Sequence, residues 1–347
     1  MSSTTAAPES NSGYDAAEEF LEHRTPAQRV QTLLHKYPWL SPAIVLIISV
    51  IVFSMLNSRF ATPNNLSLIT QQVAVVGALA VGQTLVILTA GIDLSCGAIM
   101  VFSSMVMAKT AFDSGVPGPL AILLGLGVGA LAGAANGLLV TKVRLPPFIV
   151  TLGTLNIFVA LTLLYATGRT IRDAELGTGL AWLGETFTIA DVRITTGVVV
   201  MLIMYAVFAF VLKYTAWGRH VYAVGDDAEA ARLAGIRVQR VLMSVYVTAG
   251  VLYALTGWIL IGRVNAASPN SGIDANLDSI TAVVIGGTSL FGGRGTIVGS
   301  LIGALIVGVF RNGLTLAGLD VYYQTLAVGI LIIVAVSVDQ WIRRARA

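Results

Sequence analysis

The chain has 347 residues, of which 56% are hydrophobic and 11% charged, with a formal net charge of +3. This composition, with a mean hydropathy of +0.82, excludes an ordinary soluble domain and predicts an all-α polytopic membrane protein. The basic excess follows the ends of the apolar segments, so we expect no nucleic-acid partner.

Residues 1–36 are polar and lack the charged-then-apolar pattern of a cleavable signal, which predicts a short cytoplasmic tail. A transmembrane domain over 37–342 and a second cytoplasmic tail, 343–347, follow. The domain contains ten charge-free stretches: 37–58, 60–92, 94–108, 114–141, 145–168, 194–212, 241–262, 279–293, 295–310 and 321–338. Most approach the ~20 residues that cross a bilayer, so about ten transmembrane helices are expected.

The third, eighth and ninth stretches are shorter than a full span. Snorkelling of Lys109, Arg294 and Arg311 would complete them, or they belong to broken or tilted helices. With both termini inside, 14 of the 21 Lys and Arg residues fall on the cytoplasmic side and 7 on the other. This bias supports that orientation and places a long loop, 213–240, in the cytoplasm.

Two turns interrupt the apolar stretches. The first, 91–97, holds Asp93, which we expect to N-cap the next helix with Ser95 nearby. An ionisable group at membrane depth is a candidate for function, and a plain helix cap is the alternative. The second turn, 286–295, is rich in glycine and resembles a broken-helix hairpin of the kind that transporters place beside the pathway. The two turns suggest an internal repeat of spans 2–5 and 7–10.

Glycines at four-residue spacing predict close helix packing. One set is Gly125, Gly129, Gly133 and Gly137, and a second is Gly295, Gly299 and Gly303. Uncharged polar side chains inside the spans suit a neutral polyhydroxylated solute, because they both donate and accept hydrogen bonds. The candidate translocation residues are Gln83, Asp93, Ser95, Asn136, Thr151 and Asn156. Hydrogen bonds between helices are the alternative role for each.

Catalytic and cofactor signatures are missing from the sequence. It has one cysteine, Cys96, and its three histidines fall outside the apolar stretches, so no haem or metal centre is expected. It contains no phosphate-loop motif and no Gly-Lys pair. We therefore expect no enzyme activity and no cofactor on this chain, with ATP and Mg²⁺ bound by another polypeptide if transport is ATP-driven.

The polar island 225–240 lies between two long apolar runs and predicts a short helix over 228–234. Asp227 would cap it, Glu229 would lie in the first turn and Arg232 near the end, with Gly235 in a left-handed conformation. Two helical turns are unstable alone in water, so this helix is expected to dock on a soluble partner. An ordinary loop helix is the alternative.

The motif Glu229-Ala230-Ala231-x-x-x-Gly235 resembles the EAA loop of bacterial ABC importer permeases. The runs 91–95, 145–154, 218–227 and 280–299 resemble the ribose, xylose and arabinose group of these permeases, over residues 27–344. Gly225-Asp226-Asp227, Ala267-Ser268-Pro269 and the ending 339–343 are most similar to the fructose-importer branch. The I-x-L-P run that often follows the EAA glycine in other permeases is absent, which puts their docking details in doubt.

The resemblance implies a permease dimer, expected to be a homodimer, in the bacterial inner membrane. Its partners would be a cytoplasmic sugar-type ATPase and an extracytoplasmic sugar-binding protein. The implied coupling residues are Gly225, Asp226, Asp227, Glu229, Ala230, Ala231, Arg232 and Gly235. An ion-coupled sugar carrier, an amino-acid ABC permease and a membrane scaffold or receptor are the rivals. The first two would need more charges within the spans, and a scaffold would not need the hairpins and the capped helix together.

Overall fold

The computed structural model describes residues 39–172, 179–272, 274–327, 329–330 and 333. The tails predicted at 1–36 and 343–347 lie outside these residues. The helices are α3 (Leu40–Leu56), α4 (Pro63–Leu88), α5 (Cys96–Ser114), α6 (Gly118–Thr141), α7 (Pro147–Ala166), η2 (Ala181–Gly184), α8 (Thr196–Tyr214), α9 (Ala216–Asp226), α10 (Ala228–Leu233), α11 (Val238–Val264), α12 (Ala275–Ile285) and α13 (Ile297–Leu316). The fold is therefore a polytopic bundle of apolar helices.

Among the described residues, seven helices are long and apolar enough to span a membrane: α4, α5, α6, α7, α8, α11 and α13. Helix α3 has 17 residues and α12 has 11, so both fall short of that length. The tenth stretch begins as helix over 321–327 and then lies partly outside the described residues. The all-α membrane class is confirmed, whereas the count of ten is not.

The eighth stretch is the clearest correction. It was expected to span the membrane over 279–293, but α12 begins earlier and ends at Ile285. The residues that follow include Gly287, Gly292 and Gly293, all with positive φ, a conformation that ends a helix at little cost for glycine. The absence of charge in this stretch therefore marks a glycine-rich turn between α12 and α13, and the broken-helix hairpin predicted there is present.

The third and ninth stretches form full-length helices, because each helix continues past its apolar stretch and includes a charged residue. Helix α5 continues through Lys109, which donates to the Tyr165 carbonyl at 2.8 Å and pairs with Asp113 at 3.5 Å. Helix α13 continues through Arg311. Prolines in the first turn begin α4, α6 and α7, where the missing N–H group costs nothing.

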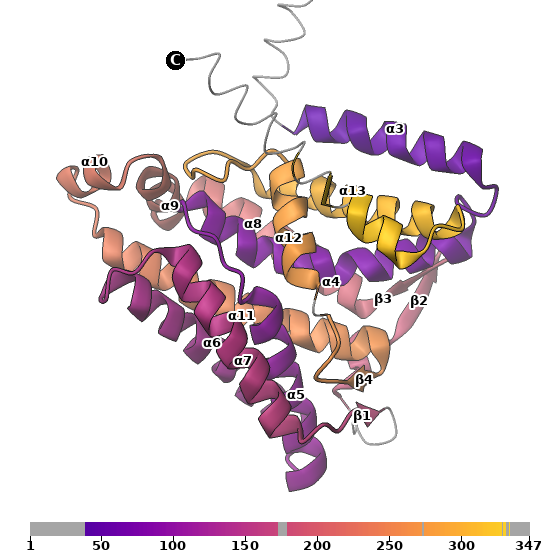
Figure 1. Ribbon diagram of the computed structural model, residues 1–347, viewed down its shortest axis with the longest axis horizontal. Coiled ribbons are helices and arrows are strands. Elements are labelled where there is room, and N and C mark those ends of the chain that lie inside the picture. Colours follow the sequence, from indigo (N-terminus) through magenta and orange to yellow (C-terminus); the bar gives the residue numbers. More distant parts are fainter. Residues whose placement is uncertain (1–38, 173–178, 273, 328, 331–332, 334–347) are drawn as a thin grey trace, which may run out of the picture.

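The helices form two groups that meet along α4 and α11 (Figure 1). One group contains α5, α6, α7 and α11, and the other contains α3, α4, α8, α12 and α13. In α4, 83% of the most apolar segment is buried, against 28% in α7, so α4 is a core helix and α7 a peripheral one. The predicted glycine faces pack as expected: a side chain at Gly129 would collide with the Gly250 carbonyl of α11.

Four short strands accompany the helices: β1 (Ile171–Arg172), β2 (Thr186–Ile189), β3 (Val192–Thr195) and β4 (Ala266–Ala267). Strands β2 and β3 form a hairpin, and β1 pairs with β4, both antiparallel. The Arg193 N–H donates to Ser67 near the start of α4 at 2.7 Å. The strands lie at one end of the molecule, and α9 and α10 lie at the other (Figure 1). The repeat of spans 2–5 and 7–10 stays a prediction.

Candidate functional site

The polar island folds as the sequence predicts. The Asp227 carboxylate accepts hydrogen bonds from the N–H groups of Glu229 and Ala230, both at 2.9 Å, and so caps α10. Glu229 binds Arg232 through two hydrogen bonds, at 3.0 and 2.5 Å. This hydrogen bond and the charge of Arg232 lower the pKa of Glu229. Gly235 follows the helix with a φ of 84°, in the left-handed region.

Helix α10 presents most of its surface to solvent. Of its six residues only Ala231 is buried, and Leu233 is 76% exposed. A helix this short gains little stability from its own hydrogen bonds, so it depends on its cap and on the contact with α9. The exposed face with its apolar Leu233 suits contact with another protein, which is the role predicted for this segment.

Behind α10, the end of α9 contacts two turns that are distant in sequence. The Gly293 N–H donates to the Leu88 carbonyl at 3.0 Å, and the Tyr222 hydroxyl donates to the Gly295 carbonyl at 2.9 Å. A side chain at Gly225 would collide with the Leu88 carbonyl oxygen and lie 2.7 Å from the Gly293 nitrogen. We call these five residues the α9 joint. It connects α9, which leads into α10, to the end of α4 and to the turn before α13.

Four of the predicted translocation residues gather at the break between α4 and α5. Asp93 accepts hydrogen bonds from the Ser95 N–H at 2.8 Å and the Ser95 hydroxyl at 2.6 Å. Asn136 of α6 donates to the Ser95 hydroxyl at 2.9 Å, and Thr151 of α7 donates to the Ile92 carbonyl at 2.9 Å. The prediction that Asp93 is the N-cap is wrong, since Ser95 holds that position and Asp93 stabilises the turn before it.

Gln83 joins the same buried region through α11. The Tyr253 hydroxyl donates to Gln83 Oε1 at 3.3 Å and also interacts with Asp93. Among the described residues, Gln83 Nε2, Asn136 Oδ1 and the Tyr246 hydroxyl have no hydrogen-bond partner. Buried polar atoms are rarely left unpaired, so this region has capacity for water or a polar solute. We refer to Gln83, Asp93, Ser95, Asn136, Tyr246 and Tyr253 as the polar cluster.

Tyr246 and Tyr253 were not among the candidates drawn from the sequence. Their spacing of seven residues places both on one face of α11, which was the available signal. Asn156, by contrast, does not join the others. It is exposed on α7, and its side chain donates to the Leu152 carbonyl of the same helix at 3.0 Å.

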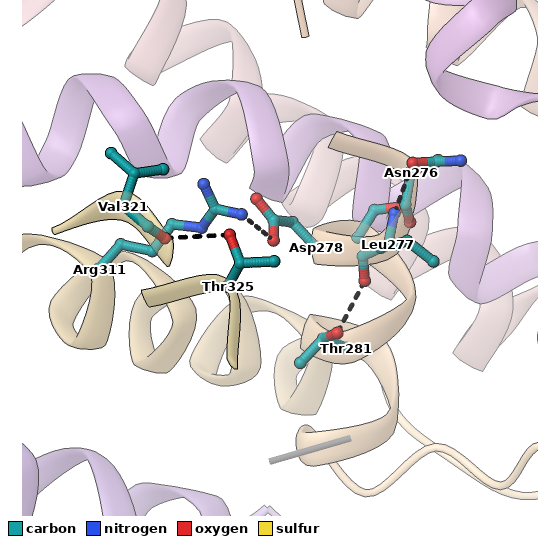
Figure 2. Close-up of polar contacts among 8 residues, drawn as sticks. Asn276, Leu277, Asp278, Thr281, Arg311, Val321 and Thr325 are labelled. Atoms are coloured by element: carbon teal, nitrogen blue, oxygen red, sulfur yellow. Dashed lines mark hydrogen bonds and ion pairs between the residues drawn. The ribbon is translucent and has the colours of Figure 1, made fainter. Parts of the chain in front are cut away.

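A charged pair was also missed. The sequence predicts either that Arg311 of α13 snorkels or that its helix is broken or tilted, whereas its guanidinium donates to Asp278 of α12 at 2.7 Å (Figure 2). The Asp278 side chain is 6% exposed and that of Arg311 is 33% exposed. Asp278 directly precedes the eighth apolar stretch and Arg311 directly follows the ninth, so residues at the boundaries of two stretches are in contact. In the part of the chain that the structure describes, no group of three His, Cys, Asp or Glu side chains is placed to hold a metal ion.

Comparison with known proteins places this geometry in a family. Residues 65–336 match the model described as "Branched-chain amino acid transport system / permease component". The chain belongs to this permease family. The match covers α4 to α13, and therefore both the α9 joint and the polar cluster.

The chain is also similar to proteins that are named as permeases. The chain is 51% identical to the fructose import permease protein of Rhizobium meliloti, over 97% of this chain and 95% of the relative. It is 44% identical to the ribose import permease protein of Bacillus subtilis, over 87% and 92%. It is 37% identical to the D-allose transport system permease protein of Escherichia coli, over 86% and 91%. No solved structure is significantly similar to the chain.

Proposed function

We propose that this chain is the membrane-spanning permease subunit of an ATP-binding cassette importer that carries a monosaccharide, with fructose as the first candidate. The observation that carries the proposal is the 51% identity to a fructose import permease over nearly the full length of both chains. Ribose and xylose are the next candidates, and relatives named for ribose and D-allose support this wider class.

The proposed assembly contains a homodimer of this chain, a cytoplasmic sugar-type ATPase that supplies ATP and Mg²⁺ binding, and an extracytoplasmic sugar-binding protein. The chain lies in the bacterial inner membrane with both termini in the cytoplasm. The position of α10, exposed and at the opposite end from the strands, supports its use as the ATPase contact (Figure 1). This chain itself has no catalytic role.

Coupling follows from the contacts of α9. When the ATPase closes, it displaces α10, and Asp227 connects that helix directly to the end of α9. The α9 joint has no space between its backbones, so a displacement of α9 must move Leu88 and Gly293 with it. Leu88 ends α4 five residues before Asp93. The movement therefore reaches the polar cluster, where the unpaired atoms would face the passing sugar.

Specific observations favour two alternative functions. The Asp278–Arg311 pair places charges among the apolar helices, as an ion-coupled carrier would require. The family description names branched-chain amino acid transport, which favours an amino-acid permease. Against the ion-coupled carrier, the charges of Asp278 and Arg311 neutralise each other. Against the second, the polar cluster has one carboxylate and no cationic side chain to hold a zwitterion.

The test is uptake of labelled fructose, ribose, xylose and leucine by cells that lack the gene and then regain it. We expect sugar uptake to return with the gene, to survive an ionophore that dissipates ion gradients, and to stop when the partner ATPase is inactivated. Uptake that an ionophore abolishes while the ATPase is inactive would establish a carrier. Restored leucine uptake without sugar uptake would establish an amino-acid permease.

A further inference from the structure

A second polar region lies away from the polar cluster, in a cavity of about 180 Å³. Side chains with hydrogen-bonding groups line much of it: Gln72, Arg263, Asp278, Arg311, Thr315 and Gln324. They come from α4, α11, α12, α13 and the residues after α13. Binding sites for drug-sized molecules begin near ~300 Å³, so this cavity suits a smaller solute.

The cavity lies towards the end of the molecule opposite the α9 joint. Gln72 is in the first half of α4, whereas Leu88 of the joint ends that helix. Asp278 is in the first turn of α12, and Arg311 is in the last third of α13, while the turn between these helices belongs to the joint. Under the proposed orientation, the cavity is on the extracytoplasmic side, where a binding protein delivers its sugar.

The ion pair leaves hydrogen-bonding capacity unused. A guanidinium has five N–H groups, and one Arg311 nitrogen, Nη2, contacts one Asp278 oxygen, Oδ1. Within the described residues, the buried Arg311 Nε has no partner. A structural Arg–Asp pair commonly uses two parallel hydrogen bonds, which this pair does not. The arrangement keeps both donors and acceptors available next to the cavity.

The other walls are apolar. Val73 and Val307 are buried and Val76 half-buried, and all three line the cavity. Val73 packs directly against Gly308, where a side chain would collide with it and fill the space. A monosaccharide has the matching surface, since its hydroxyl groups both donate and accept while its C–H faces are apolar.

We propose that the cavity lined by Gln72, Asp278, Arg311 and Gln324 is an entry subsite that binds a neutral monosaccharide before it reaches the polar cluster. This rests on the proposed function. The pairing of Arg311 with Asp278 favours a neutral solute, because a phosphate or carboxylate would have to compete with the carboxylate already bound. Gln72 of α4 would contact the sugar hydroxyls together with the side-chain oxygen of Gln324, whose Nε2 is held by Thr315 and the Leu319 carbonyl.

The first experiment replaces Gln72 with leucine in the full importer and uses Gln71→Leu as the matched control. Both change the same residue type on the same helix, and Gln71 does not line the cavity. We expect Gln72→Leu to lower the maximal uptake rate up to about tenfold at equal membrane levels, as the loss of a hydrogen bond allows. Gln71→Leu should remain near wild type. Unchanged uptake in Gln72→Leu, or an equal decrease in both variants, would overturn the inference.

The second experiment does not depend on turnover. Thr315 is exposed and lines the cavity, so Thr315→Cys in a Cys96→Ala chain reports access to it in the assembled complex without binding protein. A small water-soluble thiol reagent should modify it, and fructose or ribose at high concentration should slow the reaction several-fold, while inorganic phosphate should not.

A cysteine that the reagent does not reach, or that phosphate protects and sugars do not, would overturn the subsite. So would a reaction rate that no sugar changes. If labelled sugar enters cells although no sugar protects the cysteine from the reagent, the entry subsite is wrong and the proposed function is unaffected. If the gene restores no sugar uptake at all, the proposed function itself fails.

Discussion

Two regions of this permease, the α9 joint and the cavity beside Asp278 and Arg311, are built in opposite ways. At the α9 joint, backbones of three segments are in direct contact, and a side chain at Gly225 has no space. Beside the first half of α4, a cavity of about 180 Å³ is lined by side-chain donors and acceptors. Close backbone contact transmits displacement with little loss, whereas a polar cavity can exchange water for a solute. This difference is the reason we propose coupling at the α9 joint and recognition at the cavity.

The largest effect is expected from Gly225→Ala at the α9 joint. The new methyl group would collide with the Leu88 carbonyl, so one of the two segments must move, at a cost of about 1–3 kcal/mol. We expect sugar uptake to be lost, together with a lower melting temperature of the purified permease. Gly127→Ala is the control, because its methyl group would meet no atom within 4 Å. Wild-type uptake by Gly225→Ala would show that the joint is not tightly coupled.

A smaller effect on uptake is expected from substitution of Gly235, where the backbone conformation, and not the available space, disfavours a side chain. A side chain there meets nothing within 4 Å, but φ is 84°. Gly235→Val should cost about 1 kcal/mol or more, since a β-branched residue is poorly accommodated at positive φ. Gly235→Asn should be better tolerated. ATPase activity that continues while uptake falls in the assembled complex would show uncoupling, whereas normal uptake by Gly235→Val would contradict the role of this segment.

The polar cluster should respond to the transport state. Asn136 is fully buried and Asn156 is exposed on α7. In a Cys96→Ala chain, we expect Asn136→Cys to be inert to a water-soluble thiol reagent at rest and to react during turnover, because a route must open there. Asn156→Cys should react at a rate independent of the transport state. If Asn136→Cys stays inert in every state while transport is normal, the cluster only holds the helices together.

The smallest signal is expected from nucleotide binding to this chain alone. The sequence has no phosphate loop, so the purified permease should neither bind nor hydrolyse ATP. Equilibrium binding of labelled ATP measures this, with the reconstituted importer as the positive control. Stoichiometric binding to the isolated permease would place energy conversion on this chain and remove the reason for a separate ATPase.

Several features could be predicted from local sequence. Apolar stretches determined the membrane class, because the free energy of transferring a helix into lipid depends on composition and length. The cap at Asp227 and the left-handed Gly235 were predicted correctly, since both depend on residues within one helical turn. The broken hairpin at 286–295 was indicated by its glycines.

Tertiary structure decided the remainder, because the contacts join residues far apart in the chain. Asp278 and Arg311 flank short apolar stretches and look like boundary charges until α12 and α13 fold together. Asn136 and Asn156 are the same residue type on neighbouring helices, yet only Asn136 faces the α4–α5 break. Helical rotation decides such differences, and it is set by the packing of α6 against α11 and of α7 against α5, which hydropathy does not record.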